Sequence, residues 1–111
     1  MAECIFCQIA TGKIPASIVY QDDMVVAFKD VNPKAPVHIL IIPKKHIASL
    51  AEVKPEDLPI VAHMMEAANI AAGQQGISSY KLVINTGKEA GQVVMHLHMH
   101  LLGGKKINFL V

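Results

Sequence analysis

The chain has 111 residues and a formal net charge of +1, and 52% of its residues are hydrophobic while 17% are charged. This length fits one domain over residues 1–111, the small net charge argues against a nucleic-acid-binding surface, and no apolar run approaches the ~20 residues that span a membrane. The N-terminus lacks the basic and long apolar regions of a secretory signal, so we expect a cytoplasmic protein, and the apolar excess favours a partner subunit.

The first half of the chain predicts three strands joined by turns. Residues 10–17 contain Gly12 and Pro15 and are expected to form a loop. The segments SIVYQ (17–21) and DDMVVAFKDV (22–31) predict two strands joined by an acidic turn at residues 21–23. The prolines of VNPKAP (31–36) indicate a connection, VHILIIP (37–43) indicates a third strand, and a short helix is expected near residues 46–51.

The second half predicts one long helix followed by two strands. The helix lies within KPEDLPIVAHMMEAANIAAGQQG (54–76), where either Pro55 or Pro59 suits the first turn and Gly73 suits the end. SYKLVIN (79–85) and QVVMHLHMHLL (92–102) are expected to be strands on either side of the loop TGKEAG (86–91). Five strands and one main helix predict an α+β fold with an antiparallel sheet. Apolar residues at helical spacing predict a buried stripe made of Leu58, Val61, Met65, Ala68 and Ala72.

Three histidines alternate with apolar residues in MHLHMHLL (95–102). On a strand, His96, His98 and His100 would form one column on one face, because successive side chains point to opposite sides. Three interpretations are open for this column: a polar strand face, a zinc or copper site, or a catalytic site with one imidazole as nucleophile. The spacing alone does not separate the last two. The other face would pack on the core through Met95, Leu97, Met99 and Leu101.

Further segments accompany these histidines over nearly the whole chain. In order they are Phe6 with Ile9, KIPA (13–16), AFKDVNPKAP (27–36), HILIIPKKH (38–46), INTG (84–87), AGQ (90–92) and HLLGG (100–104). Together with the pattern His-apolar-His-apolar-His-apolar-apolar, they resemble the histidine-triad (HIT) nucleotide-binding proteins, and most of all the Hint-like branch of purine nucleoside phosphoramidate hydrolases. The resemblance implies a five-stranded antiparallel sheet with one long and one short helix, and a homodimer that joins two such sheets.

The resemblance also implies an enzyme that cleaves at the α-phosphate of nucleoside phosphoramidates or AMP conjugates, without a catalytic cofactor. His98 would attack phosphorus and form a nucleotidyl-histidine that water hydrolyses. His38 and His100 would donate hydrogen bonds to the phosphate oxygens, and His96 would complete the triad. Three alternatives stay open: a dinucleoside-polyphosphate hydrolase, a nucleotide-binding interaction module with little catalysis, and a metal-carrying protein that uses the histidine column.

The remaining nucleotide contacts are carried over from the family. Asp30 would accept hydrogen bonds from the ribose hydroxyls, although it could instead cap its own turn. The Hint-like branch generally has serine where this chain has Val93, and Lys29 and the tail KKINFLV (105–111) also depart from the branch. The phosphate would be held by Asn85, Gly91, Gln92 and Val93, and the base by an apolar slot of Ile5, Phe6, Ile9, Phe28 and Val31, each of which could instead be a core residue.

Cys4 and Cys7 are too close in sequence for a disulfide scaffold. Some relatives with an N-terminal C-x-x-C bind structural zinc with these thiolates and two histidines, which here match His46 and His96. A Cys₂His₂ set suits zinc. The alternative is a pair of buried free thiols. His63 is expected to be a surface or interface residue of the helix.

Overall fold

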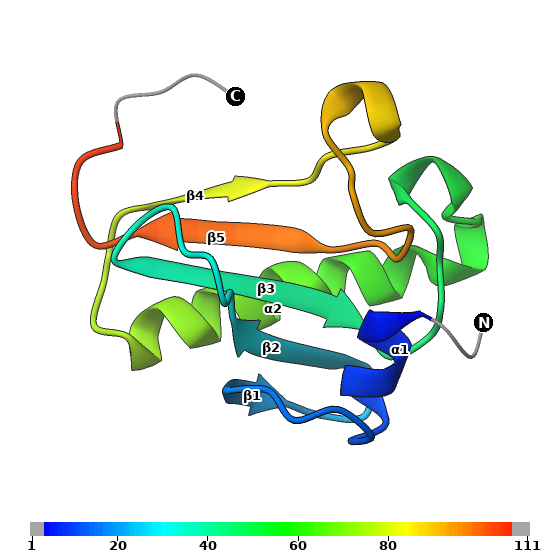
Figure 1. Ribbon diagram of the computed structural model, residues 1–111, viewed down its shortest axis with the longest axis horizontal. Helices are drawn as coiled ribbons and strands as arrows, with labels where there is room; N and C mark the ends of the chain where they lie inside the picture. Colours follow the sequence, from blue (N-terminus) through cyan, green and yellow to red (C-terminus); the bar gives the residue numbers. More distant parts are fainter. Residues whose placement is uncertain (1–3, 108–111) are drawn as a thin grey trace.

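The computed structural model describes residues 4–107, so the first three and the last four residues, including part of the KKINFLV tail, lie outside the described residues. One antiparallel sheet has the strand order β1-β2-β3-β5-β4 (Figure 1). Its strands are β1 (Ile18–Gln21), β2 (Val25–Lys29), β3 (Val37–Pro43), β4 (Tyr80–Val83) and β5 (Met99–Gly103). The helices are α1 (Ile5–Ala10) and α2 (Leu58–Gln74), with 3₁₀ turns at η1 (Leu50–Glu52), η2 (Pro55–Asp57) and η3 (Lys88–Ala90).

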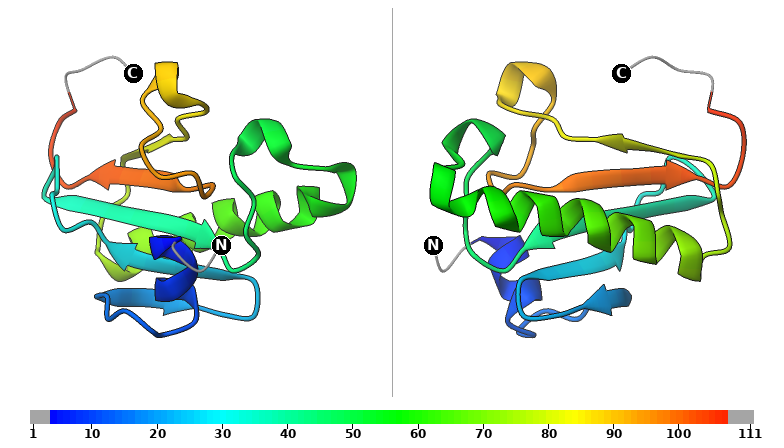
Figure 2. Two further views of the ribbon diagram at one scale, coloured as in Figure 1. Left: turned by 45° about the vertical axis from the view of Figure 1, so that its right-hand side comes forward. Right: turned by 180° about the vertical axis from the view of Figure 1, so that it is seen from behind.

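The sheet has a helix on each face. The long helix α2 runs across one face, and the short helix α1 lies on the opposite face near the end of β3 (Figure 2). Each face therefore has its own hydrophobic cluster. The α2 side is centred on Val25, Ala27, Ile39, Ile41, Met64, Leu97, Met99 and Leu101, and the α1 side consists of Phe6, Ile9, Val26, Phe28, Leu40 and Ile42.

Strand β3 is the centre of the sheet because its sequence is apolar on both faces. Ile39 and Ile41 pack toward α2, while Leu40 and Ile42 pack toward α1. Alternation along the strand sends these pairs to opposite faces. A strand covered on both sides needs a continuous apolar run, and VHILIIP supplies one. The strand predicted over residues 37–43 is confirmed with those bounds, and the α+β class with a five-stranded antiparallel sheet is confirmed with it.

The predicted last strand, 92–102, is wrong in its first half, because β5 begins only at Met99. The pairing of Ile41 with Met99 would place Pro43 opposite Leu97 if it continued, and proline has no N–H to donate to a ladder. The Leu97 N–H instead donates to the Ile47 carbonyl at 2.7 Å. His96 and His98 therefore precede the strand, and Met95, expected in the core, is 43% exposed.

The long helix lies in the predicted segment, but Pro55 belongs to the preceding 3₁₀ turn and Gly73 lies inside the helix rather than after its end. Its buried face also differs from the prediction. Ala68 and Ala72 are buried as predicted, whereas Leu58 and Met65 are 58% and 51% exposed. The face that meets the sheet consists mainly of small residues, namely Ala67, Ala68, Ala71 and Ala72 together with Met64. Small side chains let the helix backbone approach the sheet closely. A prediction of the buried face from the helical spacing of large apolar residues is therefore wrong for this helix.

Helical structure at the N-terminal end was not predicted. The helix α1 has only six residues, and the Cys4 Sγ caps it by accepting a hydrogen bond from the Cys7 N–H at 3.3 Å. The short helix expected near 46–51 is a 3₁₀ turn at Leu50–Glu52.

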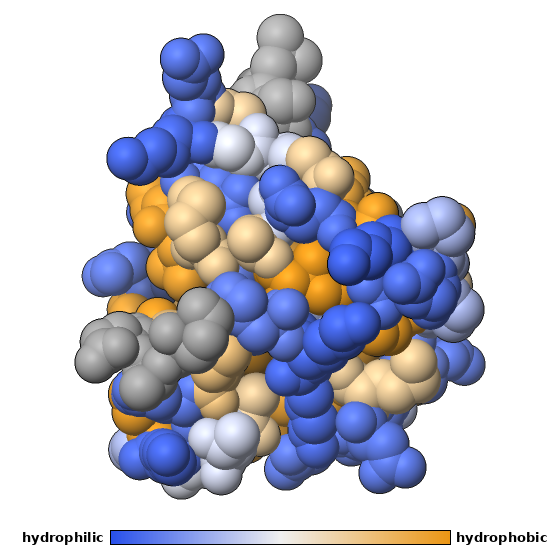
Figure 3. All heavy atoms as spheres, turned by 90° about the vertical axis from the view of Figure 1, so that its right-hand side faces the viewer, coloured by the Kyte–Doolittle hydropathy of each residue, from blue (hydrophilic) through white to orange (hydrophobic). Residues whose placement is uncertain are grey.

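Hydrophobic side chains also reach the surface in patches between hydrophilic ones (Figure 3). Among residues 4–107, no helix is long and apolar enough to cross a membrane.

Candidate active site

His38 and His100 meet on adjacent strands of the α1 face. His100 on β5 pairs with Leu40 on β3, which places the rings of His38 and His100 on a diagonal of the ladder. The His38 Nε2 and the His100 Nδ1 are 2.9 Å apart. The prediction that His38 approaches the histidine column is thus reproduced by the register of two neighbouring strands.

One backbone amide sets the protonation of both rings. The Lys34 N–H donates to the His38 Nδ1 at 2.9 Å, so the His38 Nδ1 is an acceptor and its hydrogen is on Nε2. That N–H points to the His100 Nδ1, with the Asp30 Oδ2 also 3.3 Å from the His38 Nε2. The His100 Nδ1 is then an acceptor as well. The hydrogen of His100 therefore lies on its Nε2, as a donor available to a ligand.

His98 is oriented by a different backbone group. Its Nδ1 lies 2.7 Å from the carbonyl oxygen of His96, which can only accept, so the His98 Nδ1 carries the hydrogen. The lone pair of the neutral ring is then on Nε2, where a nucleophile needs it. The Phe6 ring packs edge-on against His98 at a centroid distance of 5.1 Å, and the His100 ring is 5.2 Å away. His98 is held on both sides although it lies outside β5.

Burial favours the neutral form of the His38 and His100 rings. It lowers the pKa of His100 to about 4, and the neighbouring His98 and His38 rings add to the effect. Burial likewise lowers the pKa of His38, although the Asp30 carboxylate acts in the opposite direction. Neutral rings have one donor and one acceptor nitrogen each. The chain of hydrogen bonds from Lys34 through His38 to His100 requires that state.

A cavity of about 400 Å³ opens beside His38 and His100. Asp30, Asn85 and Val93, three of the predicted nucleotide contacts, lie on its wall. The Asp30 Oδ1 accepts a hydrogen bond from the Asn32 N–H, so Asp30 caps its own turn, and its place on the cavity wall is compatible with ribose binding, which stays a prediction. Sequence reasoning missed Asn32, Lys34, Val83 and Leu102, which also line the cavity, because only the fold brings their strands and loop together.

The loop before the histidines has a structural residue at its centre. Gln92 is 2% exposed, and its side-chain oxygen accepts from the Gly87 N–H while its amide donates to the carbonyls of Ala48 and Val94. This side chain therefore holds the loop together, and its own polar atoms are occupied within the protein. Gly91 has φ of +98°, a conformation that favours glycine.

The five residues of the predicted base slot separate into two groups. Phe6, Ile9 and Phe28 are buried in the α1-side cluster, where Phe6 also contacts the His96 and His98 rings. Ile5 is 46% exposed and Val31 is 90% exposed. Phe6 thus supports the histidines and packs in turn on Phe28, while the exposed Ile5 and Val31 are accessible to a ligand.

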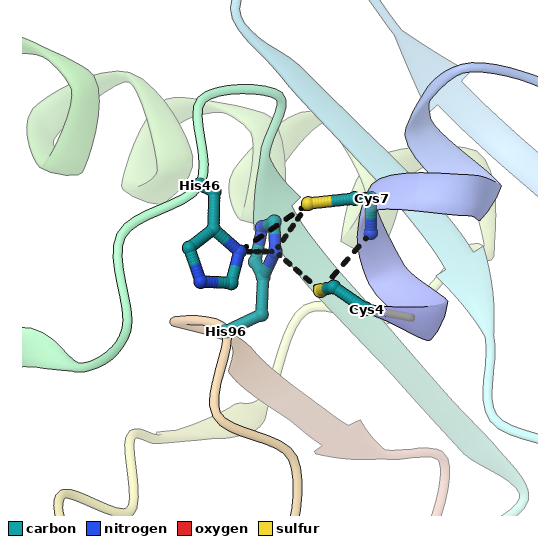
Figure 4. Close-up of side chains that lie close together, drawn as sticks. All are labelled: Cys4, Cys7, His46 and His96. Atoms are coloured by element: carbon teal, nitrogen blue, oxygen red, sulfur yellow. Dashed lines mark hydrogen bonds between the residues drawn. The ribbon is translucent and has the colours of Figure 1, made fainter. Parts of the chain in front are cut away.

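A second cluster lies between α1 and the segment before β5. Cys4, Cys7, His46 and His96 turn their side chains toward one another, and their ligand atoms all lie within 4.8 Å of one another (Figure 4). The His96 Nδ1 is 3.3 Å from the Cys4 Sγ and 3.1 Å from the His46 Nδ1, and the Cys7 Sγ is 3.3 Å from the His46 Nδ1. Four ligands around a tetrahedral zinc ion lie roughly 3.3–3.7 Å apart, given bond lengths of about 2.0–2.3 Å.

The surroundings of this cluster also suit a cation. The His96 Nε2 lies 2.9 Å from the Pro43 carbonyl and donates to it, which turns the Nδ1 lone pair toward the thiols. A metal-binding histidine typically makes such a hydrogen bond with its other nitrogen. Burial, followed by the hydrogen bond and charge of Cys4, raises the pKa of the Cys7 thiol, so the thiolate form needs a cation nearby.

The described part of the chain contains another group of potential metal ligands, which consists of Asp30, His38 and His100. His98 does not belong to this group. The hydrogen bond between the two rings occupies the His38 Nε2 and the His100 Nδ1. The geometry thus offers no support for a metal held by the whole histidine column.

The comparisons with known proteins agree with this geometry. The family model described as scavenger mRNA decapping enzyme C-term binding matches residues 3–108. The purine nucleoside phosphoramidase of Escherichia coli is 46% identical over 107 residues, which cover 95% of this chain and 90% of that protein. A solved HIT family hydrolase from Clostridium thermocellum superposes with a TM-score of 0.96 at 44% identity and covers 100% of this chain and 98% of its own.

The chain belongs to the histidine-triad (HIT) family.

The family assignment predicted from the motifs is confirmed. A zinc-bound HIT protein from Mycobacterium smegmatis also superposes, with a TM-score of 0.81 at 32% identity, and covers 97% of this chain and 81% of its own. Similarity to HIT proteins over nearly the whole chain explains why segments far from the histidines, such as AFKDVNPKAP, match as well.

Proposed function

We propose that this HIT protein hydrolyses nucleoside phosphoramidates or related AMP conjugates at the α-phosphate, through a covalent nucleotide on His98. The observation that carries the proposal is the 2.7 Å contact between the His98 Nδ1 and the His96 carbonyl, because it leaves the Nε2 lone pair free. Support also comes from the E. coli relative, which is named a purine nucleoside phosphoramidase.

In the first step, the His98 Nε2 lone pair forms a bond to phosphorus while the phosphorus–nitrogen bond breaks. The amine leaves with the bonding electron pair and takes up a proton from the solvent. The imidazole becomes cationic as the new bond forms, so its Nδ1–H donates a stronger hydrogen bond to the His96 carbonyl. In the second step, a water oxygen forms a bond to phosphorus and loses a proton to the solvent while the phosphorus–Nε2 bond breaks, and the electron pair of that bond returns to the His98 Nε2, which releases the nucleotide and restores the neutral ring.

His100 would donate a hydrogen bond to a phosphate oxygen, whereas His38, which was also expected to donate to the phosphate, would act through His100 because its Nε2–H points to the His100 Nδ1. The His100 Nε2–H is the donor that the chain of hydrogen bonds leaves free, and the His38 ring behind it is fixed by the Lys34 N–H. Donors that are held in place before the reaction stabilise charge as it develops in the transition state. Asn85, on the wall of the same cavity, would bind a further phosphate oxygen.

Replacement of His98 tests this proposal. His98→Ala is expected to lower kcat on adenosine phosphoramidate by at least ~10⁴-fold, because the nucleophile is absent. His63→Ala is the matched control, since it removes a histidine from α2 on the opposite face of the sheet. Activity of His98→Ala within tenfold of the wild type would contradict the assignment, whereas AMP binding is expected to survive.

We also propose that Cys4, Cys7, His46 and His96 hold a structural zinc ion. The spacing of their ligand atoms and the Pro43 hydrogen bond to His96 support it. Bound zinc would fix α1 and the segment that carries His98. Metal analysis of the purified protein is expected to give one zinc per chain, and Cys7→Ser is expected to lose it. A wild-type protein that contains no metal after purification in zinc-supplemented medium would contradict this.

The homodimer and the cytoplasmic location remain proposals. Exposed apolar side chains on α2, such as Leu58, Met65 and Ile70, support a partner surface. Light scattering during size-exclusion chromatography is expected to give twice the chain mass of 12.0 kDa. Comparison of a phosphoramidate with a dinucleoside polyphosphate as substrates would separate the proposed reaction from the dinucleotide alternative.

A further inference from the structure

One lysine lines the cavity beside His38 and His100. Lys34 lies in the connection between β2 and β3, and among the described residues that line the cavity it is the only lysine or arginine. Its ammonium group makes no ion pair within residues 4–107. An exposed lysine with no carboxylate partner at the edge of an active-site cavity is available to a negatively charged ligand.

The Lys34 charge is close enough to act on both rings. Burial is the largest cause that lowers the pKa of His38 and of His100, and the positive charge of Lys34 contributes to the lowering at each of them. An anion that binds near the His100 Nε2–H therefore also experiences this charge. Asn32 and Asn85, whose side chains make no hydrogen bond within the described part of the chain, add uncharged polar groups to the same wall.

The position of the cavity indicates which part of the substrate it receives. His100 and His38 line it, whereas His98 is not among its described lining residues. In an in-line displacement, the leaving group departs on the side of phosphorus opposite the nucleophile. With the phosphoryl group at the His100 Nε2–H and Asn85, and the ribose at Asp30, the part of the wall formed by Lys34, Val83 and Leu102 is left for the leaving group. A volume of about 400 Å³ is enough for a small organic leaving group.

We infer that Lys34 is a specificity-determining residue that favours substrates whose leaving group carries a negative charge, such as a carboxylate or a further phosphate. The inference rests on the proposed function and names the class of leaving group for that reaction. Val83, Val93 and Leu102 form the apolar part of the cavity and would contact the carbon chain between the scissile bond and the anion.

The Lys34 side chain and backbone have separable roles. The backbone N–H fixes the His38 ring at 2.9 Å, and every residue except proline supplies that group. The substitution Lys34→Gln removes the charge and keeps the N–H. Lys54→Gln is the matched control, because Lys54 is also exposed, lies before η2 outside the described cavity wall, and changes the net charge equally.

Three substrates test the inference: adenosine 5′-phosphoramidates of β-alanine, of β-alaninamide and of 2-aminoethyl phosphate. The first two differ only in whether the leaving group ends in a carboxylate or a neutral amide. In Lys34→Gln, the kcat/KM ratio of the β-alanine to the β-alaninamide substrate is expected to fall about fivefold, the effect of an exposed ion pair. Lys54→Gln is expected to keep the wild-type ratio, and 0.5 M salt is expected to reduce the wild-type preference.

The outcomes separate the inference from the function beneath it. If the phosphate-bearing substrate loses more than the β-alanine substrate in Lys34→Gln, the preferred anion is a phosphate, and the reverse result identifies a carboxylate. The inference is overturned, and the hydrolase function stands, if the wild type hydrolyses all three substrates and Lys34→Gln changes neither of two kcat/KM ratios. These are the ratio of the β-alanine to the β-alaninamide substrate and the ratio of the 2-aminoethyl phosphate to the β-alaninamide substrate. If the wild type hydrolyses none of them, the proposed function fails and the inference fails with it.

Discussion

The neutral state of His100 makes a quantitative prediction about stability in acid. In the folded protein the pKa of His100 is lowered from 6.5 to about 4, chiefly by burial. Between these two pH values the unfolded chain binds a proton that the folded chain excludes, so stability falls as the pH falls. The full shift corresponds to at most about 3 kcal/mol, at roughly 1.4 kcal/mol per pKa unit. At pH 5 the loss relative to pH 7 is about 2 kcal/mol.

The assay is urea denaturation of the wild type and of His100→Gln at pH 7 and pH 5. The variant lacks the titrating ring, so its stability should fall by about 2 kcal/mol less than that of the wild type over this range. Acid effects shared by both proteins, including weaker metal binding, cancel in the comparison. Equal losses in the two proteins would refute the reasoning. So would a His100 ring resonance that titrates near pH 6.5 in NMR spectra of the folded protein.

Three further predictions concern the supports of the site. Gln92→Leu leaves the Gly87 N–H and two carbonyls without their hydrogen-bond partner, so urea denaturation should show a free energy of unfolding about 2–4 kcal/mol lower than that of the wild type. A decrease below about 0.5 kcal/mol would contradict the structural role of Gln92. Asp22→Ala removes the carboxylate that accepts from the Met24 N–H and from the His63 ring, and it should cost about 2 kcal/mol while kcat is unchanged. A strong chelator should lower Tm of the wild type by more than ~10 °C and leave Cys7→Ser unaffected; equal responses would exclude a metal on Cys7.

Much of the fold could be predicted from the sequence because its strongest signals are local. VHILIIP is an apolar β-branched run between two prolines, and it forms β3 over the predicted residues. After Pro59, which suits a first turn, the long helix contains no proline or glycine until Gly73. Its buried face was misplaced because the helix packs on the sheet through alanines, and the spacing of larger residues gives no sign of that contact.

The end of the last strand depends on a contact that no local pattern encodes. The alternation of MHLHMHLL predicts a strand over all its residues, yet the Leu97 N–H binds the Ile47 carbonyl, 50 residues away in the chain. This departure separates the roles of the histidines. His96 turns its ring to the cysteines and its carbonyl to His98, while His100 remains in β5 beside His38.

The candidate site could be predicted residue by residue where a family motif reached it, but its hydrogen bonding could not. The motif places His38 and His100 in one site. The order of donors and acceptors in their hydrogen bonds, however, follows from the backbone N–H of Lys34. Because every residue type except proline has a backbone N–H, the sequence gives no sign of this contact. Lys34 was not predicted as a site residue because nothing in the sequence distinguishes a lysine in a proline-rich turn from other solvent-exposed lysines. Only the fold brings its side chain to the wall that His38 and His100 share.

The central claim is that His98, and no other histidine, carries the nucleotide during turnover. The most direct measurement is rapid acid-free quenching of the wild type with adenosine phosphoramidate, followed by protease digestion and mass spectrometry of the peptide that contains residues 92–105. An added AMP is expected on His98 of the wild type and is expected to be absent from His98→Ala. An adduct on His96 or His100, or turnover with no adduct at any quench time while the substrate is saturating, would contradict it.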